Sequence, residues 1–193
     1  LSTSRYGSRS ATPVIREPDM PARQRFILVP ARPAARAAER LFRTLRLTLR
    51  RRGLKAEVLH IGATALRGMP TKGDLDIVVR VPAMMFPQAE RCLTRMLARN
   101  LGSDRTDRFA AFKDDDATPP LGVQLVAIGS EHDDFHIALN RLRSDSLIRW
   151  RLRLLKWRHD GRSMQRYRRA KGTLLDDTVR SEAASRISHS ELP

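Results

Sequence analysis

The 193-residue sequence predicts an α/β domain with an all-helical C-terminal part. Two observations carry this prediction. Between residues 57 and 128, short apolar runs bounded by turn residues have the length of strands, and stretches with helical spacing separate some of them. Beyond Ser130, apolar residues recur only at spacings of three and four, which is typical of helices. The chain is long enough to bury one hydrophobic core.

The first elements follow from local signals along the chain. Leucines at a spacing of four predict a helix over residues 33–52, opened by a proline and stopped by Gly53. A second helix is expected at 87–101, between Pro87 and Gly102. The apolar runs predict four strands, at residues 57–62, 76–81, 108–113 and 121–128. A shorter run at 26–29 predicts a further small strand.

Two features of the C-terminal part predict how its helices begin and pack. Ser130, with Asp133 three residues later, resembles a capping box and predicts the start of a helix. A helix over residues 147–157 carries an apolar stripe at spacings of three and four, made of Leu147, Trp150, Leu154 and Trp157 and widened by Ile148, Leu152 and Leu155. We interpret this stripe as facing the core; a platform on which bases stack is the alternative.

Basic residues exceed acidic ones, and the formal net charge is +16. The excess gathers in two helical windows. Residues 141–171 hold twelve Lys and Arg against two acids, and residues 33–55 hold eight against one. Two such helix faces could bind RNA or another polyanion. A solvated Arg-rich surface is the alternative interpretation.

Composition also predicts the domain limits and the compartment. Residues 1–25 lack periodicity and predict a disordered tail, residues 176–193 predict a loose tail, and residues 26–175 form the predicted domain. No apolar run approaches the roughly 20 residues that span a bilayer, and no signal sequence is visible. Cys92 is the single cysteine, which fits a reducing compartment. We therefore expect a cytoplasmic protein without a membrane partner.

A pair of carboxylates predicts a metal site. Asp74 and Asp76 stand at the head of the apolar run 77–81. Residues i and i+2 of a strand point to the same face, so these side chains should project side by side. Two like charges at such a distance raise the free energy unless a cation lies between them. Paired carboxylates suit Mg²⁺, which takes one or two of them together with substrate phosphates.

The turn before this pair predicts a phosphate site. Gly62 and the small residue Ala63 end the preceding strand, so backbone N–H groups can approach a phosphate closely. Arg67 and Lys72 lie in the loop between the turn and the carboxylates, where they could offset phosphate charge. Metal, phosphates and an attacking hydroxyl in one place would suffice for nucleotidyl transfer.

The stretch from His60 to Val81, HIGATALRGMPTKGDLDIVVRV, resembles the signature of the nucleotidyltransferase superfamily. That signature is an apolar residue, Gly, a small residue, ten further residues and then Asp-apolar-Asp-apolar. More narrowly, the chain resembles the GrpB-like family, and three other stretches support this match: residues 120–125, the helix entry at 129–131, and residues 161–171. The resemblance covers roughly residues 26–175. It implies the nucleotidyltransferase fold, a small mixed sheet flanked by helices.

The resemblance also implies an activity and its cofactor. A nucleoside monophosphate would pass from an NTP to an unidentified acceptor, with Mg²⁺ or Mn²⁺ as the metal. Asp74 and Asp76 would be the catalytic, metal-binding residues. The residues that would bind the nucleotide are Gly62, Ala63, Thr64, Lys72 and Lys171.

Two positions depart from the superfamily pattern. Ala63 stands where Ser or Gly is common, so a hydroxyl that could contact phosphate is missing. Gln124 stands at the natural position for a third carboxylate and leaves a two-metal site one negative charge short. The alternative hypothesis is therefore a catalytically degenerate nucleotide- or RNA-binding module of the same fold.

Overall fold

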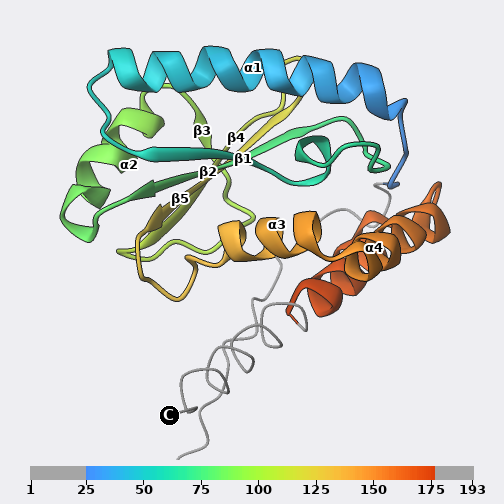
Figure 1. The fold of residues 1–193 in the computed structure, drawn as a ribbon. Helices are drawn as coiled ribbons and strands as arrows, with labels where there is room; N and C mark the ends of the chain where they lie inside the picture. The colour runs from blue at the N-terminus through green and yellow to red at the C-terminus, as the bar shows by residue number, and fades with distance from the viewer. Residues whose placement is uncertain (1–24, 177–193) are drawn as a thin grey trace, which may run out of the picture.

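The computed structural model of the chain describes residues 25–176 (Figure 1). All the strands lie between residues 57 and 127, and the chain after them is mainly helical. The named helices are α1 (Ala31–Arg51), α2 (Phe86–Thr94), α3 (Phe135–Ser144) and α4 (Ser146–His159), with short 3-10 turns at Ala63–Ala65 and Ala83–Met85. The strands are β1 (Glu57–Ile61), β2 (Leu75–Val81), β3 (Ala98–Arg99), β4 (Phe109–Asp114) and β5 (Leu121–Ala127). Residues 164–176 are also helical.

The strands form one mixed sheet in the order β1-β2-β5-β4-β3. β2 and β5 are parallel, whereas the pairs β1–β2, β4–β5 and β3–β4 are antiparallel. The two central strands are adjacent although about forty residues separate them in the chain. The small mixed sheet flanked by helices, implied by the family resemblance, is confirmed.

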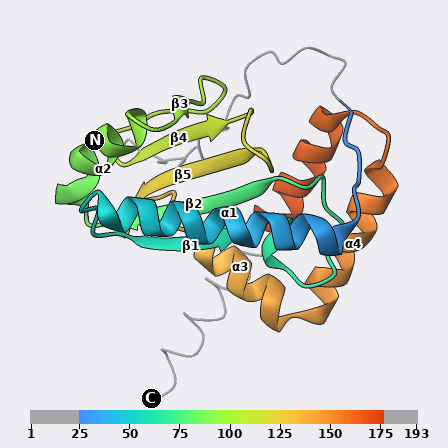
Figure 2. The ribbon, with the colours of Figure 1, turned by 90° about the horizontal axis from the view of Figure 1, so that it is seen from above.

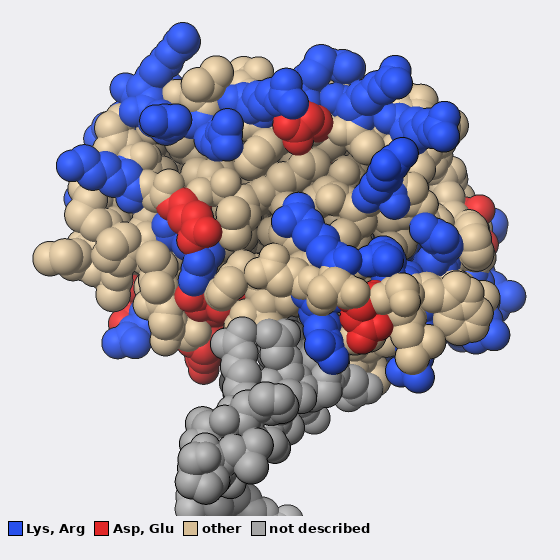
Figure 3. All heavy atoms as spheres, in the orientation of Figure 1, with Lys and Arg blue, Asp and Glu red and all other residues tan. Residues whose placement is uncertain are grey.

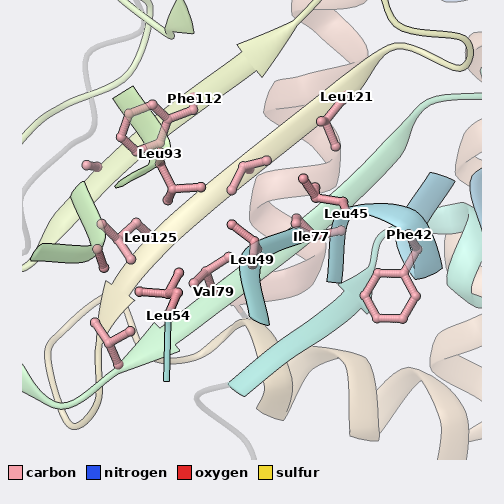
Figure 4. Packing of buried hydrophobic residues seen from close by; sticks show 14 of the residues in the cluster. Phe42, Leu45, Leu49, Leu54, Ile77, Val79, Leu93, Phe112, Leu121 and Leu125 are labelled. Carbon is pink, nitrogen blue, oxygen red and sulfur yellow. The ribbon is translucent and has the colours of Figure 1, made fainter. Parts of the chain in front are cut away.

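One face of the sheet is covered by α1 and α2 (Figures 1 and 2). α1 buries Ala38, Phe42, Leu45 and Leu49, close to the leucine spacing that predicted this helix. These side chains pack on alternate residues of β2, including Ile77 and Val79 (Figure 4). Each fully buried aliphatic or aromatic side chain contributes roughly 1.5–3 kcal/mol, so this layer accounts for a large part of the hydrophobic stabilisation.

The opposite face of the sheet is covered by α3, α4 and the helix at 164–176 (Figure 1). It carries Asp76, Val78 and Arg80 from β2, because alternate residues of a strand point to opposite faces. Val78 packs with Leu139 of α3 and Leu152 of α4 in a second core cluster. Asp76 therefore faces the C-terminal helices rather than α1.

Arg80 fixes the loop that leads into α3. The prediction that Ser130 and Asp133 form a capping box is wrong, because Asp133 binds Arg80 instead. Its guanidinium donates to both carboxylate oxygens of Asp133, over 2.6 and 2.7 Å, and also contacts Glu57. Asp133 accepts a further hydrogen bond from Gly129 N–H, and α3 begins at Phe135 without a side-chain cap. A bidentate, charge-assisted pair is stronger than the cap that the sequence suggested.

Two local predictions differ from the structure. The helix expected at 87–101 ends at Thr94, because Ala98–Arg99 pair with β4 as an edge strand and Arg99 binds Glu90. The run at 26–29 forms isolated bridges, Arg25 with Ser163 and Val29 with Thr71, rather than a strand. Apart from residues 25 and 176, the predicted tails lie outside the described residues.

The interpretation of the aromatic stripe on α4 as core is wrong. Leu147, Trp150 and Trp157 are 54%, 54% and 56% exposed. Ile148 and Leu152 of α4 are buried instead in the second core cluster, and Lys156 is buried beside the Phe26 and Tyr167 rings. The helix has two competing apolar stripes, and the one with smaller side chains fits the second core cluster. Within residues 25–176, no helix has both the length and the apolar character needed to cross a membrane.

Candidate functional site

A cavity of about 290 Å³ lies on the face of the sheet that α3, α4 and the helix at 164–176 cover. Apolar side chains from these helices, such as Phe135, Leu139 and Leu152, form much of its wall. The predicted site residues that line this cavity are Gly62, Ala63, Lys72, Asp74, Asp76, Gln124 and Lys171. Thr64 and the exposed Arg67, which were also predicted to contact phosphate, do not line it. The fold thus gathers residues from the Gly62 turn, two strands and the last helix.

Asp76 has room for its carboxylate because both neighbouring strands present glycine beside it. It is paired with Ile61, next to Gly62, on one side and with Gly122 on the other. A Cβ at Gly62 would lie 2.7 Å from Asp76 Oδ2, and a Cβ at Gly122 would lie 3.0 Å from Oδ1. Gly62 also has a φ of +75°, a backbone conformation that residues with a side chain rarely adopt. Gly122 was not singled out from the sequence.

The surroundings of Asp76 oppose its ionisation. Burial, and to a smaller extent the nearby Asp74 carboxylate, raises the pKa of Asp76 to about 6, against the opposing charges of Lys171, Lys72 and Lys156. A carboxylate that is costly to ionise in the free protein gains the most from a cation beside it. This is the electrostatic condition of a cation site.

Asp74 is held by contacts on both its side chain and its backbone. Its carboxylate Oδ2 lies 2.8 Å from Lys72 Nζ. Its backbone carbonyl accepts a 3.0 Å hydrogen bond from the Thr64 hydroxyl, and Thr64 in turn lies 2.9 Å from His60 Nε2. The structure thus places the Thr64 side chain behind the cavity wall, where it positions the loop that carries Asp74.

His60 belongs to this supporting layer. Its Nδ1 lies 3.6 Å from Glu39 Oε2 of α1, and its ring packs against Phe42 at a centroid distance of 5.4 Å. Burial lowers the pKa of His60, although Glu39 opposes the shift. A neutral imidazole between Glu39 and Thr64 connects α1 to the Asp74 loop.

Gln124 supplies an acceptor that nothing in the described structure uses. It lies on β5, two residues after Gly122, and points to the same face as Asp76. Its Oε1 is buried without a hydrogen-bond partner. A buried carbonyl oxygen without a partner costs free energy, and a bound cation or donor would recover it. This is the third position that the sequence identified.

Lys156 is a site residue that sequence reasoning missed. It lines the cavity from α4 and is only 4% exposed, yet no carboxylate of the described chain pairs with it. Its ammonium lies 5.3 Å from the Phe26 ring and 5.2 Å from the Tyr167 ring. Burial lowers its pKa to about 8, with Lys171 adding to the shift. The signal in the sequence that could have identified Lys156 is its place at helical spacing after the apolar residues Ile148 and Leu152.

Phe26 and Tyr167 close the end of the cavity near Lys156. Their rings stack at a centroid distance of 3.8 Å with 19° between the planes. Tyr167 is 5% exposed, and its burial, together with the Asp74 and Asp76 charges, raises the pKa of its phenol. Phe26 joins the start of the domain to its last helix, so both ends of the described chain build the site.

The residues present fit a hard divalent cation. Asp74, Asp76 and the unpartnered amide of Gln124 offer only oxygen ligands, which Mg²⁺ prefers. Within the described range, no three His, Cys, Asp or Glu residues cluster as a ready-made metal site. A metal held by these oxygens would have further positions open to water or to a bound phosphate.

Comparison with known proteins identifies the family. The sequence profile of the GrpB protein family matches residues 28–181. The chain belongs to the GrpB family. A UPF0157 protein of Vibrio cholerae serotype O1 is 30% identical over 142 residues, covering 72% of this chain and 74% of that relative. The family resemblance seen in the sequence is confirmed.

Two solved structures are similar to this chain over part or most of its length. The crystal structure of the conserved protein GrpB from Enterococcus faecalis matches 76% of this chain and 94% of its own, with 14% identity and a TM-score of 0.57. Cid1 poly(U) polymerase, solved with Mg and 3′-dATP bound, gives a TM-score of 0.43 at 14% identity. That match covers 63% of this chain and 40% of the polymerase, so this GrpB-family chain spans well under half of it.

The glycine beside Asp76 yields a test by double mutation. We expect Gly122→Ala to lower the free energy of unfolding by about 1–2 kcal/mol, since its Cβ would press on Asp76 Oδ1. In an Asp76→Ala background the same change should be neutral or slightly stabilising, because the carboxylate is gone. Urea unfolding of the four proteins measures this coupling, and Gly172→Ala, whose Cβ would meet nothing within 4 Å, is the control. An equal cost in both backgrounds would contradict the glycine cradle.

The raised pKa of Asp76 yields a second test. Because the folded-state pKa of about 6 exceeds the ordinary value of 3.8, ionisation of this group destabilises the fold as pH rises through that window. In metal-free buffer, Asp76→Asn should therefore be more stable than wild type at pH 7, by about 1–3 kcal/mol, and equal to it near pH 3.5. Urea unfolding at both pH values measures the difference. The exposed Asp116→Asn should show no such pH dependence, and a pH-independent effect of Asp76→Asn would count against this assignment.

Proposed function

We infer that the protein is a metal-dependent nucleotidyltransferase that moves a nucleoside monophosphate from an NTP to an acceptor. One observation carries the inference. Asp76 is given space by glycines on both flanking strands, beside Asp74, in a cavity whose other polar side chains are mostly cationic. Membership of the GrpB family and the likeness of the fold support it.

The acidic and the cationic residues of the lining match the two kinds of charge in a metal–nucleotide complex. Asp74 and Asp76, with Gln124, would hold Mg²⁺ or Mn²⁺, which when bound supplies positive charge to phosphate oxygens. The cationic side chains would neutralise the triphosphate, and they are Lys72, Lys156, Arg168 and Lys171. Gly62 and Ala63 also line the cavity, and their backbone N–H groups would contact phosphate oxygens.

The apolar part of the wall suits the rest of a nucleotide. Phe135, Leu139 and Leu142 of α3 line the cavity, and they would exclude water from a bound nucleotide. Lower water content strengthens every charge interaction in the site. Lys156 is the most buried of the cationic residues that line the cavity, so its attraction to a phosphate would be strengthened most.

A second candidate is a nucleotide-binding module that does not turn over. The observation that favours it is Gln124, because a neutral amide in the third position leaves the described site with two carboxylates. Both candidates require the nucleotide to bind with metal. They differ in whether pyrophosphate is released, so the same preparation tests both.

The binding that both candidates require is tested by a thermal-shift panel of the four NTPs, each with and without Mg²⁺, and pyrophosphate release from an NTP that binds then separates the enzyme from the module. A ligand that binds the native state raises the melting temperature by mass action. We expect at least one NTP to raise it only with Mg²⁺, and Asp74→Asn or Asp76→Asn to abolish the shift. The exposed loop variant Asp116→Asn should keep it. A shift that survives both site variants, or no shift with any NTP, would refute the proposal.

Lys156 gives a prediction in which stability and binding move in opposite directions. Lys156→Met removes a buried cation while keeping the side-chain volume, so the metal-free protein should gain about 1–2 kcal/mol at pH 7. The same change should weaken Mg²⁺–NTP binding about tenfold, because a charge-assisted phosphate contact is lost. Isothermal titration and urea unfolding measure the two effects, with the exposed Lys55→Met as the control. Lower stability with unchanged affinity would show that Lys156 only packs.

A further inference from the structure

The outward face of α4 is an apolar strip on the surface of the domain. Leu147, Trp150 and Trp157 are each more than half exposed, and Leu154 lies partly buried between them. The two tryptophans are seven residues apart, which is two helical turns or about 10 Å along one face. We refer to Leu147, Trp150, Leu154 and Trp157 as the tryptophan strip.

The tryptophan strip contributes little to the core. The inward residues of α4, Ile148, Leu152 and Lys156, carry its packing on the sheet and on the cavity. The two tryptophans that this chain contains are thus both placed on the outside of the same helix. Large aromatic side chains gathered at the surface are typical of binding sites rather than of solvated helix faces.

Arginines border the tryptophan strip. Arg151 and Arg158, also seven residues apart, are exposed and have no hydrogen-bond or ion-pair partner within the described chain. They line a shallow groove of about 250 Å³ between α4 and the helix at 164–176. From Ser146 to His159 the helix contains five Lys and Arg and no Asp or Glu.

The arginines on the other side of the tryptophan strip are fixed by backbone carbonyls. Arg149 donates to the carbonyls of Leu142 and Arg143 over 3.0 and 2.7 Å, and Arg153 donates to Gly68 over 3.4 Å. Figure 3 shows Lys and Arg side chains around the part of the surface that α3 and α4 form. An apolar, aromatic surface between two rows of cations fits a ligand with flat rings and regularly spaced negative charges.

We propose that the outward face of α4 binds single-stranded RNA, with bases stacked on Trp150 and Trp157 and phosphates paired with Arg151 and Arg158. Stacking on aromatic side chains requires unpaired bases, which excludes a duplex as the ligand. RNA is favoured over DNA because loops and ends of RNA are single-stranded in their ordinary state. An acidic protein would match the charges, but it would leave the stacking surfaces of the tryptophans without flat partners.

The test uses the full chain and a fluorescein-labelled twelve-residue oligouridine, with anisotropy as the readout. We expect binding, and quenching of tryptophan fluorescence on titration. The double variant Trp150→Ala/Trp157→Ala should lose at least tenfold in affinity. Its matched control is Leu47→Ala, an exposed apolar residue of α1, which should leave the affinity unchanged. Circular dichroism checks that each variant keeps its fold and melting temperature.

A second pair of variants separates a specific contact from general attraction to a basic protein. Arg151→Gln/Arg158→Gln should weaken binding and reduce its salt dependence. Arg36→Gln/Arg40→Gln, which removes the same charge from exposed positions of α1, should have a much smaller effect. Equal losses for the two pairs would overturn the proposal, since any polyanion would then be bound by net charge alone.

Three further outcomes would overturn the proposal. The first is RNA affinity that the tryptophan double variant leaves unchanged. The second is a concentration-dependent mass in sedimentation that the same variant abolishes, because the strip would then join two copies of the chain. The third is equal or tighter binding of the matching oligothymidine, which would make DNA the ligand. Because the double variant leaves the cavity intact, its Mg²⁺–NTP thermal shift reports the proposed function separately.

Discussion

The space around the Asp76 carboxylate is the constraint on which the rest of the structure depends. A carboxylate on a central strand of a five-stranded sheet would ordinarily meet side chains from both neighbouring strands. Here both neighbours present glycine, and a Cβ at either would lie within 3.0 Å of a carboxylate oxygen. The parallel pairing of β2 with β5 brings Gly122 into register with Asp76. The sheet order is therefore what makes an acidic site possible in the middle of the fold.

The helical C-terminal part provides the opposite charge. Lys156 from α4 and Lys171 from the last helix line the cavity that Asp74 and Asp76 also line. The pKa of Asp76 is raised and that of Lys156 is lowered, so burial opposes both charged forms in the free protein. Such a site is poised to gain from a ligand that carries both a cation and phosphate groups. Apolar packing holds the C-terminal helices on the sheet, and Asp76 and Lys156 do not form an ion pair that would do so.

Much of this arrangement followed from the sequence, and what did not has physical reasons. The Gly62 turn follows one predicted strand, the Asp pair stands at the head of the next and Gln124 lies on a third, and all of them line one cavity. Gly122 was missed because its role depends on the register between β2 and β5, which no local pattern reveals. Lys156 was missed because a lysine interrupts the apolar row of Ile148 and Leu152, and that row was taken only as the margin of the aromatic stripe.

The same reasoning explains the errors in the fold. The edge strand β3 was taken for the end of a helix, since two residues of pairing leave no periodicity. Asp133 was assigned to a cap because Arg80, its partner in the structure, is 53 residues away in the chain. In each case a long-range contact outweighed a local preference, whereas elements with strong local periodicity, such as α1, were placed correctly.

The stacking of Phe26 on Tyr167 bears on how much of the chain the site requires. Residues 26–29 exchange backbone hydrogen bonds with Arg162, Gly161 and Thr71, and Leu28 N–H donates to the Asp160 side chain. This segment precedes every strand, yet it is fastened to the last helices. During synthesis the pocket cannot form until the helix at 164–176 has left the ribosome. A fragment with only the sheet and α1 would keep Asp74 and Asp76 but would lose the wall that carries Lys156 and Lys171.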